Sequence, residues 1–319
     1  MLSIWLHFYV CNNRCILLLL LNVRSPMRLA YLVLAHRFPA QLARLCAALS
    51  GDSDSIFVHV DAKTSQEPFE AEVARRTDAV AFVQERVACR WGDFSIVQAT
   101  LNGLRAIRAS GQQFDYVNLL SGQDYPLSSP ARIKERLGNN GAEYIQIKPL
   151  ADPSWGTPNG RMERVEHTWY MPLYKPDFDR PGMGIIRRTA DALTTLGARK
   201  RNLPGVTFYG GAQWWSLTYP CILDILEHVE RRAEFLSFFR GAYVPDEIFF
   251  HTILAETGHL PQATGLSLRF IDWSSGKPAV MDHALLEQAL VDDALFARKF
   301  DACADPSLLD DLDRRIGVR

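Results

Sequence analysis

The sequence has 319 residues, of which 48% are hydrophobic and 22% are charged, and its formal net charge is −1. This composition is ordinary for a soluble globular protein with a sizeable core, built as one large α/β domain or two small ones. The balance of 35 basic against 36 acidic residues argues against a protein that coats nucleic acid, while a local basic pocket remains compatible with it. None of the six cysteines has CxxC spacing, which favours a reducing compartment over a disulfide framework.

The first 26 residues do not fit a regular pattern. The apolar run Cys15–Val23 is shorter than the ~20 residues that a membrane-spanning helix needs, and polar residues separate it from the apolar run Leu2–Val10. A clean strand follows Met27. We therefore expect residues 1–26 to be an extension that arises from a start codon placed too early, or else a short hydrophobic segment, and we leave them out of the fold.

Buried strands alternate with amphipathic helices between residues 28 and 126. The predicted strands are Arg28–Ala35, Ile56–Val60, Ala79–Val83 and Tyr116–Leu120, and the predicted helices are Pro39–Leu49, Glu67–Arg76 and a segment that follows the loop Arg90–Asp93. Such alternation is typical of an α/β fold with a mostly parallel central sheet flanked by helices. In these sheets ligands bind beyond the carboxyl ends of the strands. The residues that fall there are His36, Asp61, Trp91 and Gln123–Asp124, and they predict a nucleotide-type site.

The pattern changes after Tyr144. Residues 150–204 show little periodicity apart from a predicted helix near 187–199, and their aromatic content indicates an ordered, ligand-facing segment rather than disorder; the aromatic residues are Trp155, Trp169, Tyr170 and Tyr174. Further elements are predicted at Gln213–Leu217 (strand), Pro220–Arg232 (helix), Arg269–Trp273 (strand) and Ala284–Leu290 (helix). We expect one domain over residues 27–305 and a C-terminal tail over residues 306–319.

The stretch from Val244 to Leu254 carries the strongest candidate for catalysis. Pro245 is suited to the first turn of a helix, and the carboxylates Asp246 and Glu247 follow it. Apolar residues at helical spacing complete the stretch and predict a buried face: Ile248, Phe249, Ile253 and Leu254. The sequence thus predicts a helix that begins at Pro245 with a carboxylate near its exposed end. The alternative is that both acids only stabilise the start of the helix.

Two further features concern phosphate and metal binding. Asp52 and Asp54 have the spacing of a DxD metal-binding pair, but they precede a strand, where a polar turn is the simpler interpretation. One carboxylate, Asp124, follows the fourth strand, which makes a poor Mg²⁺ or Mn²⁺ site. The cations Arg298 and Lys299, with Lys277, could instead stabilise a diphosphate; the alternative is an exposed basic pair at a helix end. No GxSxG, GxGxxG or Walker-type loop is present.

Several motifs occur in order along the chain. They are YLVLAH (31–36), FVHVD (57–61), RWGDFSIVQATLNGL (90–104), YVNLLSGQDYPL (116–127), GGAQWWSLT (210–218), PDEIFFHTIL (245–254), LRFIDW (268–273) and LFARKFDA (295–302). Together they resemble the core-2/I-branching N-acetylglucosaminyltransferase and peptide O-xylosyltransferase family, glycosyltransferase family 14, over roughly residues 28–305. The resemblance implies a GT-A-type nucleotide-sugar transferase fold, an inverting mechanism and a UDP-sugar donor, with no cofactor and no metal.

The resemblance also implies roles for individual residues. Glu247 is similar to the catalytic base, and Trp273 to an aromatic residue that packs on the acceptor sugar. The positions that resemble the UDP-sugar-binding residues are Leu34, Asp61, Cys89, Arg90, Trp91, Gln213, Trp214, Lys277, Arg298 and Lys299. Among them, Gln213 departs from the aspartate that xylosyltransferases have before the tryptophan.

The expected reaction is transfer of GlcNAc or xylose from UDP to a hydroxyl of a glycan or polysaccharide acceptor. The cysteines that cross-link the animal enzymes are not evident, so we expect a bacterial-type member in the cytoplasm, with association at the inner face of the membrane left open. No nucleic-acid partner is expected. Two alternatives remain: a catalytically inactive sugar-binding module on the same fold, and a metal-dependent GT-A transferase that uses Asp52 and Asp54.

Overall fold

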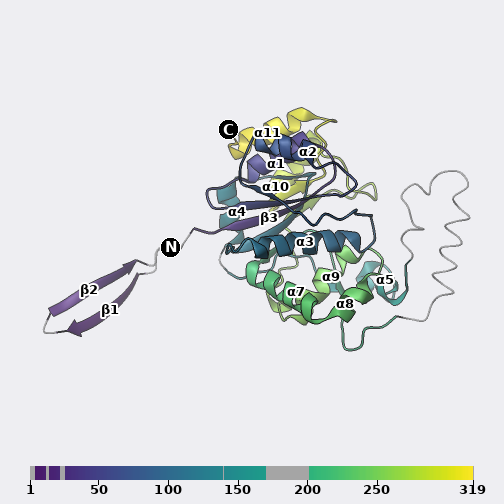
Figure 1. Ribbon diagram of the computed structural model, residues 1–319, viewed down its shortest axis with the longest axis horizontal. Helices are drawn as coiled ribbons and strands as arrows, with labels where there is room; N and C mark the ends of the chain where they lie inside the picture. Colours follow the sequence, from purple (N-terminus) through teal and green to yellow (C-terminus); the bar gives the residue numbers. More distant parts are fainter. Residues whose placement is uncertain (1–3, 12–13, 22–25, 139, 170–200, 319) are drawn as a thin grey trace, which may run out of the picture.

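The computed structural model describes residues 4–11, 14–21, 26–138, 140–169 and 201–318, and its centre is a five-stranded sheet of order β10-β6-β3-β4-β5 (Figure 1). The strands are β3 (Leu29–Ala35), β4 (Ser55–Val60), β5 (Val80–Phe82), β6 (Tyr116–Ser121) and β10 (Ser216–Thr218). All neighbours pair in parallel except β10, which is antiparallel to β6. The prediction of a mixed α/β fold with a mostly parallel central sheet is confirmed.

Helices cover both faces of this sheet, as Figure 1 shows. On one side lie α1 (Pro39–Leu49), α2 (Glu67–Ala74), α4 (Pro130–Leu137), α10 (His283–Val291) and α11 (Pro306–Ile316). On the other lie α3 (Ser95–Ala109), α7 (Tyr219–Arg231), α8 (Ala233–Phe239) and α9 (Phe249–Glu256). Alternate residues of β3 enter the two cores, Tyr31 and Val33 the first and Ala30 and Leu32 the second, because successive side chains of a strand point to opposite faces.

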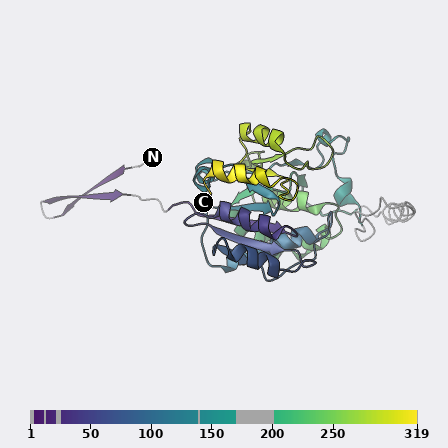
Figure 2. The same cartoon turned by 90° about the horizontal axis from the view of Figure 1, so that it is seen from above.

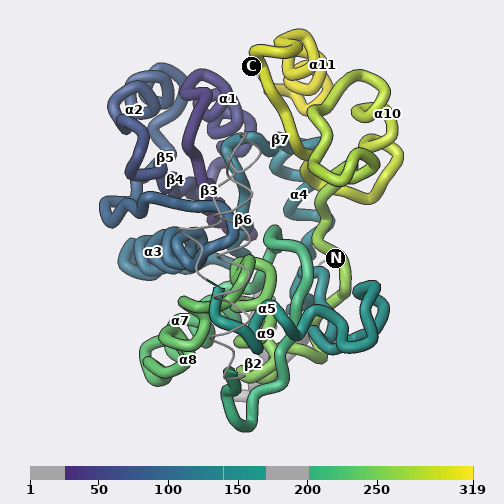
Figure 3. The backbone as a smooth tube through the Cα atoms, turned by 90° about the vertical axis from the view of Figure 1, so that its right-hand side faces the viewer, coloured from purple at the N-terminus to yellow at the C-terminus, as the bar shows by residue number. Residues whose placement is uncertain are grey.

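A second, three-stranded sheet continues from the carboxyl end of β6. It contains β11 (Arg269–Ile271), β12 (Phe296–Arg298) and β7 (Asp124–Pro126), in which β12 is the central strand. Since β7 follows β6 after two residues, β12 is brought to the edge of the central sheet, and β7 lies beside α1 (Figure 3). Strands β8 (Lys148–Pro149) and β9 (Tyr209–Gly210) form a short ladder near the long excursion.

The segment after residue 305 is a helix, not the tail that we expected. In α11 the residues Leu308, Leu309, Leu312 and Ile316 are buried in the same core as α1. Arg44 of α1 pairs with Asp313 at 2.7 Å, so an ion pair joins the two helices in addition to their apolar contact. The i, i+1, i+4, i+8 spacing of these leucines and isoleucine is the apolar face of an amphipathic helix.

The helix expected from Pro245 begins four residues later than the sequence predicts, at Phe249. Pro245–Glu247 forms a 3-10 turn, Ile248 has non-helical torsion angles, and α9 starts at Phe249. The Glu247 carbonyl accepts a hydrogen bond from the Gly211 N–H at 3.0 Å. In a continuous helix this carbonyl would instead accept from the N–H four residues later in the chain. The predicted apolar residues from Ile248 to Leu254 are nevertheless buried.

The N-terminal strands β1 (Ile4–Cys11) and β2 (Arg14–Leu21) pair in an antiparallel sheet of their own, drawn apart from the other elements in Figures 1 and 2. Among the helices of the described residues, none combines the length and the apolar character that crossing a membrane requires. The helix predicted near 187–199 lies outside the described residues, as do Tyr170 and Tyr174.

Candidate active site

The turn after β4 forms one wall of the candidate site. The Asp61 N–H donates to the Ala35 carbonyl at 2.8 Å, and the Asp61 carboxylate accepts from the Lys63 N–H at 2.9 Å. The Lys63 ammonium lies 3.4 Å from the same carboxylate and also donates to the Cys89 carbonyl. Leu34 is partly buried near the end of β3. The carboxyl ends of β3 and β4 are thus connected directly to the loop that contains Cys89.

The loop Cys89–Asp93 carries an exposed tryptophan toward the segment before Glu247. The side chain of Trp91 is 61% exposed, and its ring meets that of Tyr243 edge-on at 5.9 Å. Next to it, the Gly92 carbonyl accepts from the Val244 N–H at 2.9 Å. Burial raises the pKa of the Cys89 thiol to about 12, which disfavours the reactive thiolate form.

Glu247 is held at an exposed position by an ion pair. One of its carboxylate oxygens lies 2.8 Å from an Arg164 guanidinium nitrogen, and the side chain of Glu247 is 30% exposed whereas that of Arg164 is 12% exposed. Arg164 comes from the short helix α5 (Glu163–Glu166) in the excursion that we expected to face a ligand. The pair leaves part of the carboxylate accessible while fixing its direction.

Asp246, in contrast to Glu247, is buried. It is 6% exposed, and within the described residues its Oδ1 atom has no hydrogen-bond partner. Burial, with a smaller contribution from the neighbouring charge of Glu247, raises the pKa of Asp246 to about 7. A perturbed pKa is a common sign of a catalytic group. Here accessibility decides, because a base has to touch the hydroxyl that it deprotonates, and of the two acids only Glu247 reaches the surface.

Arg298 lies on the other side of the site, in β12. Its guanidinium stacks 4.3 Å from the centre of the Trp214 ring, and its Nε atom lies 3.4 Å from an Asp124 oxygen. Asp124 is 1% exposed and also accepts from the Ser121 N–H at 3.0 Å. The alternative of an exposed pair at a helix end is therefore wrong for Arg298, which is a largely buried strand residue.

Lys299 follows in a half-buried position. Burial lowers the pKa of its ammonium group, and the nearby cations Arg37, Arg298 and Lys277 lower it further. Two acids offset part of this positive charge, since Asp301 lies 3.9 Å from Arg37 and Asp124 lies 3.4 Å from Arg298. The remaining excess of positive charge makes the cluster a candidate place for a phosphate group. Exposed Lys277 belongs to the loop after β11, which meets Lys299 where the Lys299 N–H donates to the Ala279 carbonyl at 3.3 Å.

A buried glutamine fixes the segment that contains these cations. The side-chain amide of Gln41, in α1, donates to the carbonyls of Gly122 at 3.2 Å and Phe300 at 3.3 Å. Its oxygen accepts from the Ala302 N–H at 2.8 Å. The chain after β12 is therefore attached to the carboxyl end of β6, where the sequence predicts the ligand.

The predicted residues thus form a connected rim. Backbone hydrogen bonds join the Glu247 segment to the Trp91 loop and to Gly211, which leads to Gln213 and Trp214. Trp214 in turn supports Arg298. Trp273 is 55% exposed in the turn after β11. Arg90 is exposed beside Trp91.

Asp54 lies at the other end of β4 from Asp61. It accepts from the Leu29 N–H at 2.9 Å and pairs with Lys134 at 2.8 Å. Both contacts hold the start of the sheet together, as a polar turn would, and Asp52 is exposed in the same turn. Because β4 separates Asp54 from the carboxyl edge, the Asp52–Asp54 pair is not part of the candidate site.

The described chain also contains two surface hollows, and neither includes a predicted site residue. One has a volume of about 310 Å³ and is lined by Asp224, Glu227, His228, Arg231, Arg232 and Thr257. The other, of about 400 Å³, is lined by Ala47, Glu72, Arg75 and Arg76. The candidate site at the sheet edge is therefore defined by the grouping of its side chains and not by the size of a hollow.

Sequence reasoning missed four residues that complete the site. Arg37 and Lys63 lie two and three residues after the ends of predicted strands, so their position in the sequence is a usable signal. Asp124 was considered only as a metal ligand, whereas it is the counter-ion of Arg298. Arg164 gave no signal, because its segment has no periodicity that would place it next to Glu247.

A comparison with protein families decides the relationship. The model of the Core-2/I-Branching enzyme family matches residues 29–292 of the chain. The chain belongs to the Core-2/I-branching enzyme family. The resemblance inferred from the ordered motifs is therefore confirmed, and the matched range contains all the candidate site residues except Arg298 and Lys299.

This family member is also similar to curated xylosyltransferases. Xylosyltransferase 2 from Canis lupus familiaris and from Homo sapiens are each 25% identical to it over 312 residues, which cover 90% of this chain and 33% of the relative. Xylosyltransferase 1 from Rattus norvegicus is 25% identical over 258 residues, which cover 78% of this chain and 28% of the relative. The chain spans about a third of the length of these relatives.

Proposed function

We propose that this protein is an inverting, metal-independent glycosyltransferase with a GT-A-type fold, which transfers GlcNAc or xylose from a UDP-sugar to a hydroxyl of a glycan or polysaccharide. Membership of the Core-2/I-branching enzyme family and similarity to xylosyltransferases support a glycosyltransferase. The observation that carries the proposal for this chain is the connected rim with a partly exposed carboxylate, Glu247, on one side and clustered cations at Arg298 and Lys299 on the other.

The proposed reaction needs one base and one group of cations. The acceptor hydroxyl oxygen attacks the anomeric carbon, and the bond from that carbon to the UDP oxygen breaks on the opposite face. Glu247 takes the hydroxyl proton, and the electron pair of the broken bond stays on the UDP phosphate. A hydroxyl is too weakly acidic to ionise beforehand, so its proton has to move to a base within hydrogen-bond reach as the oxygen attacks.

The negative charge that develops on UDP is assigned to Arg298, Lys299 and Lys277, with Arg37 beside them. Cations fixed near a leaving phosphate oxygen stabilise it as a metal ion would, and an arginine held from behind by Asp124 needs little rearrangement to do so. Leu34 and Asp61 would hold the uridine, with the loop Cys89–Trp91 against the nucleotide and Gln213–Trp214 against the donor sugar. Trp273 would pack on the acceptor sugar.

A screen of UDP-sugars tests the proposal. We expect the purified protein to bind UDP and to hydrolyse or transfer either UDP-GlcNAc or UDP-xylose, measured as UDP released. The same screen with Glu247→Gln separates enzymatic turnover from a contaminant. Binding of UDP-sugars without turnover of any would instead indicate a sugar-binding module, and failure to bind UDP at all would contradict the proposed site.

A further inference from the structure

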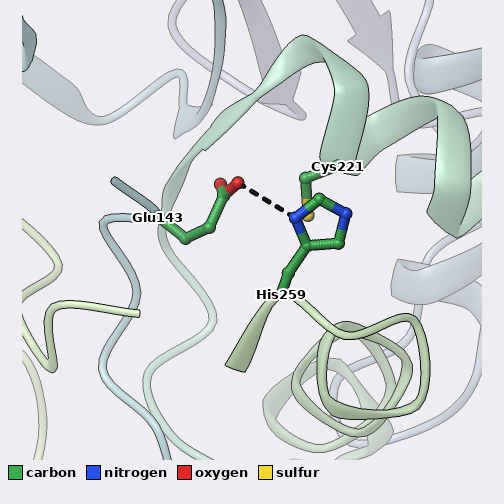
Figure 4. A group of neighbouring side chains, drawn as sticks. All are labelled: Glu143, Cys221 and His259. Atoms are coloured by element: carbon green, nitrogen blue, oxygen red, sulfur yellow. Dashed lines mark ion pairs between the residues drawn. The ribbon is translucent and has the colours of Figure 1, made fainter. Parts of the chain in front are cut away.

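A cluster of metal-ligand side chains lies outside the candidate active site. Glu143 precedes β8, Cys221 lies in the first turn of α7, and His259 follows α9 (Figure 4). One ligand atom from each of the three lies within 4.8 Å of those of the other two. In the described part of the chain, this is the one group of three or more His, Cys, Asp or Glu residues with such spacing. Carboxylate, thiolate and imidazole are the ligand types that zinc uses in proteins.

Glu143 is buried but keeps one acceptor position toward the cluster. It is 1% exposed, and its oxygens accept from the Thr218 N–H at 2.8 Å and the Thr218 hydroxyl at 2.6 Å. Each carboxylate oxygen offers two lone pairs. The oxygen that accepts from the hydroxyl therefore has a second lone pair, and it lies 3.4 Å from Nδ1 of His259.

The other ring nitrogen of His259 is already paired with a carboxylate. Its Nε2 atom lies 2.8 Å from an Asp224 oxygen, so the neutral ring is assigned a proton on Nε2 and a lone pair on Nδ1. That lone pair faces the Glu143 oxygen, and two lone pairs repel unless a cation or a further proton lies between them. Zinc-binding histidines commonly donate their second N–H to a carboxylate in this way.

The spacing and the charges suit a tetrahedral ion. Two nitrogen or oxygen ligands on zinc stand ~3.3 Å apart for bonds of ~2.0 Å, which is close to the 3.4 Å between Glu143 and His259. A sulfur ligand on zinc stands ~3.5 Å from the other ligand atoms. Because the three ligand atoms already lie within 4.8 Å of one another, the sulfur of Cys221 has to move by about 1 Å. One thiolate and one carboxylate neutralise a divalent cation, which makes burial of the ion tolerable.

The cluster also has a route to solvent. Asp224, the partner of His259, lines the hollow of about 310 Å³ beside α7. His259 itself is 17% exposed at its side chain. An ion or its fourth ligand, a water molecule, can therefore reach the cluster from this hollow.

We propose that Glu143, Cys221 and His259 bind a divalent transition-metal ion, best matched by Zn²⁺, with water as the fourth ligand and Asp224 as the group that orients the histidine. The ion joins three segments that are distant in the sequence: the chain before β8, the start of α7 and the end of α9. Its role is structural, since Glu247 and the cations come from other segments. The proposal does not depend on the glycosyltransferase function.

Cobalt replaces zinc as a visible probe. We expect protein that has been treated with chelator and then freed of it to bind one Co²⁺ per chain, with a thiolate-to-cobalt charge-transfer absorption band. Cys221→Ser should abolish the band, while Cys46→Ser, at another buried cysteine, should retain it. Zn²⁺ at a hundredfold excess over its Kd should raise the Tm of the wild type by on the order of 5 °C and leave that of Cys221→Ser unchanged.

His259→Gln provides a second variant in case Cys221→Ser does not fold, and it should lower Co²⁺ affinity at least tenfold. Absence of Co²⁺ binding in the wild type, or a charge-transfer band that persists in folded Cys221→Ser, would overturn the proposal. In that case the three side chains form a hydrogen-bonded cluster only. Because the readouts are absorption and Tm, neither outcome bears on whether UDP-sugars are turned over.

Discussion

The two sides of the candidate site are built differently. The carboxylate side, Glu247 with Arg164, sits on a 3-10 turn and a four-residue helix, and backbone hydrogen bonds attach it to neighbouring loops. The cation side, Arg298 and Lys299, ends a strand that is braced by Asp124 and Gln41. On the first side, the turn and the ion pair fix one accessible carboxylate. On the second side, a buried acid offsets part of the repulsion between neighbouring cations. We infer that the first side serves the chemical step and the second serves binding of the diphosphate, and this division can be tested.

The largest expected effect is on the rate of Glu247→Gln. The amide keeps the shape of the side chain but cannot accept the acceptor's proton, so the turnover rate should fall roughly 10²-fold or more. UDP affinity should stay within a few-fold of the wild type, because the diphosphate contacts lie on the cation side. Turnover in steady state and UDP binding by calorimetry, on the same preparation, check both statements.

Asp246→Asn is the matched control for that experiment. Asp246 is adjacent in sequence but buried, so its substitution should reduce the rate far less. A Glu247→Gln variant with near wild-type turnover, next to an inactive Asp246→Asn variant, would show that the base is assigned to the wrong carboxylate.

On the cation side we expect an effect on binding. Lys299→Ala removes a charge-assisted contact to phosphate, which is worth about 1.5–3 kcal/mol, so UDP affinity should fall tenfold or more and transfer should slow. Arg298→Ala should weaken UDP binding similarly, but it also leaves Asp124 buried without its partner and should lower Tm. Lys299→Ala is therefore the cleaner test. Unchanged UDP affinity in both variants would mean that the pair does not contact the diphosphate.

A smaller effect is expected on stability as a function of pH. The pKa of Asp246 is about 7 in the folded protein and ~3.9 in an unfolded chain, so folding favours its protonated form. Protonated Asp246 therefore contributes its full stabilisation below the pKa that Asp246 has in the unfolded chain. This stabilisation is lost as the pH rises through the pKa that Asp246 has in the folded protein. Asp246→Asn removes this dependence.

The free energy of unfolding of Asp246→Asn relative to wild type should therefore increase between pH 5 and pH 8. An increase of about 1 kcal/mol or more is expected, since one pKa unit corresponds to ~1.4 kcal/mol. Urea unfolding of both proteins at the two pH values measures it. A difference that does not change with pH would show that Asp246 is ionised throughout, and it would weaken the contrast between the two acids.

The sequence predicts the parallel strands and the polar residues at their ends because both signals are local. A buried run such as Leu29–Ala35 is recognisable from its own residues, and Asp61 follows from the end of such a run. The buried face of α9 is predicted for the same reason. The leucines of α11 carry the same signal, and they outweigh the prediction of a tail over residues 306–319.

What the sequence does not predict depends on contacts between distant segments. Nothing near Arg298 indicates that Asp124 lies behind it, since the two meet only when β12 pairs with β7. The start of α9 shifts because Gly211 takes the Glu247 carbonyl, which a local helix signal cannot anticipate. Arg164 reaches Glu247 from an irregular segment for which no periodicity exists.

The central claim is that protein cations take the place of a catalytic metal, and the dependence of transfer on chelation tests it most directly. Initial rates of UDP release from the active donor are measured in excess EDTA and with added Mn²⁺. The wild type is compared with Cys221→Ser, because this variant lacks the proposed structural ion. We expect both proteins to keep most of their activity in EDTA at a temperature well below their Tm. Activity that is abolished by EDTA in both and restored by Mn²⁺ would contradict the claim and would require a metal site at the sheet edge.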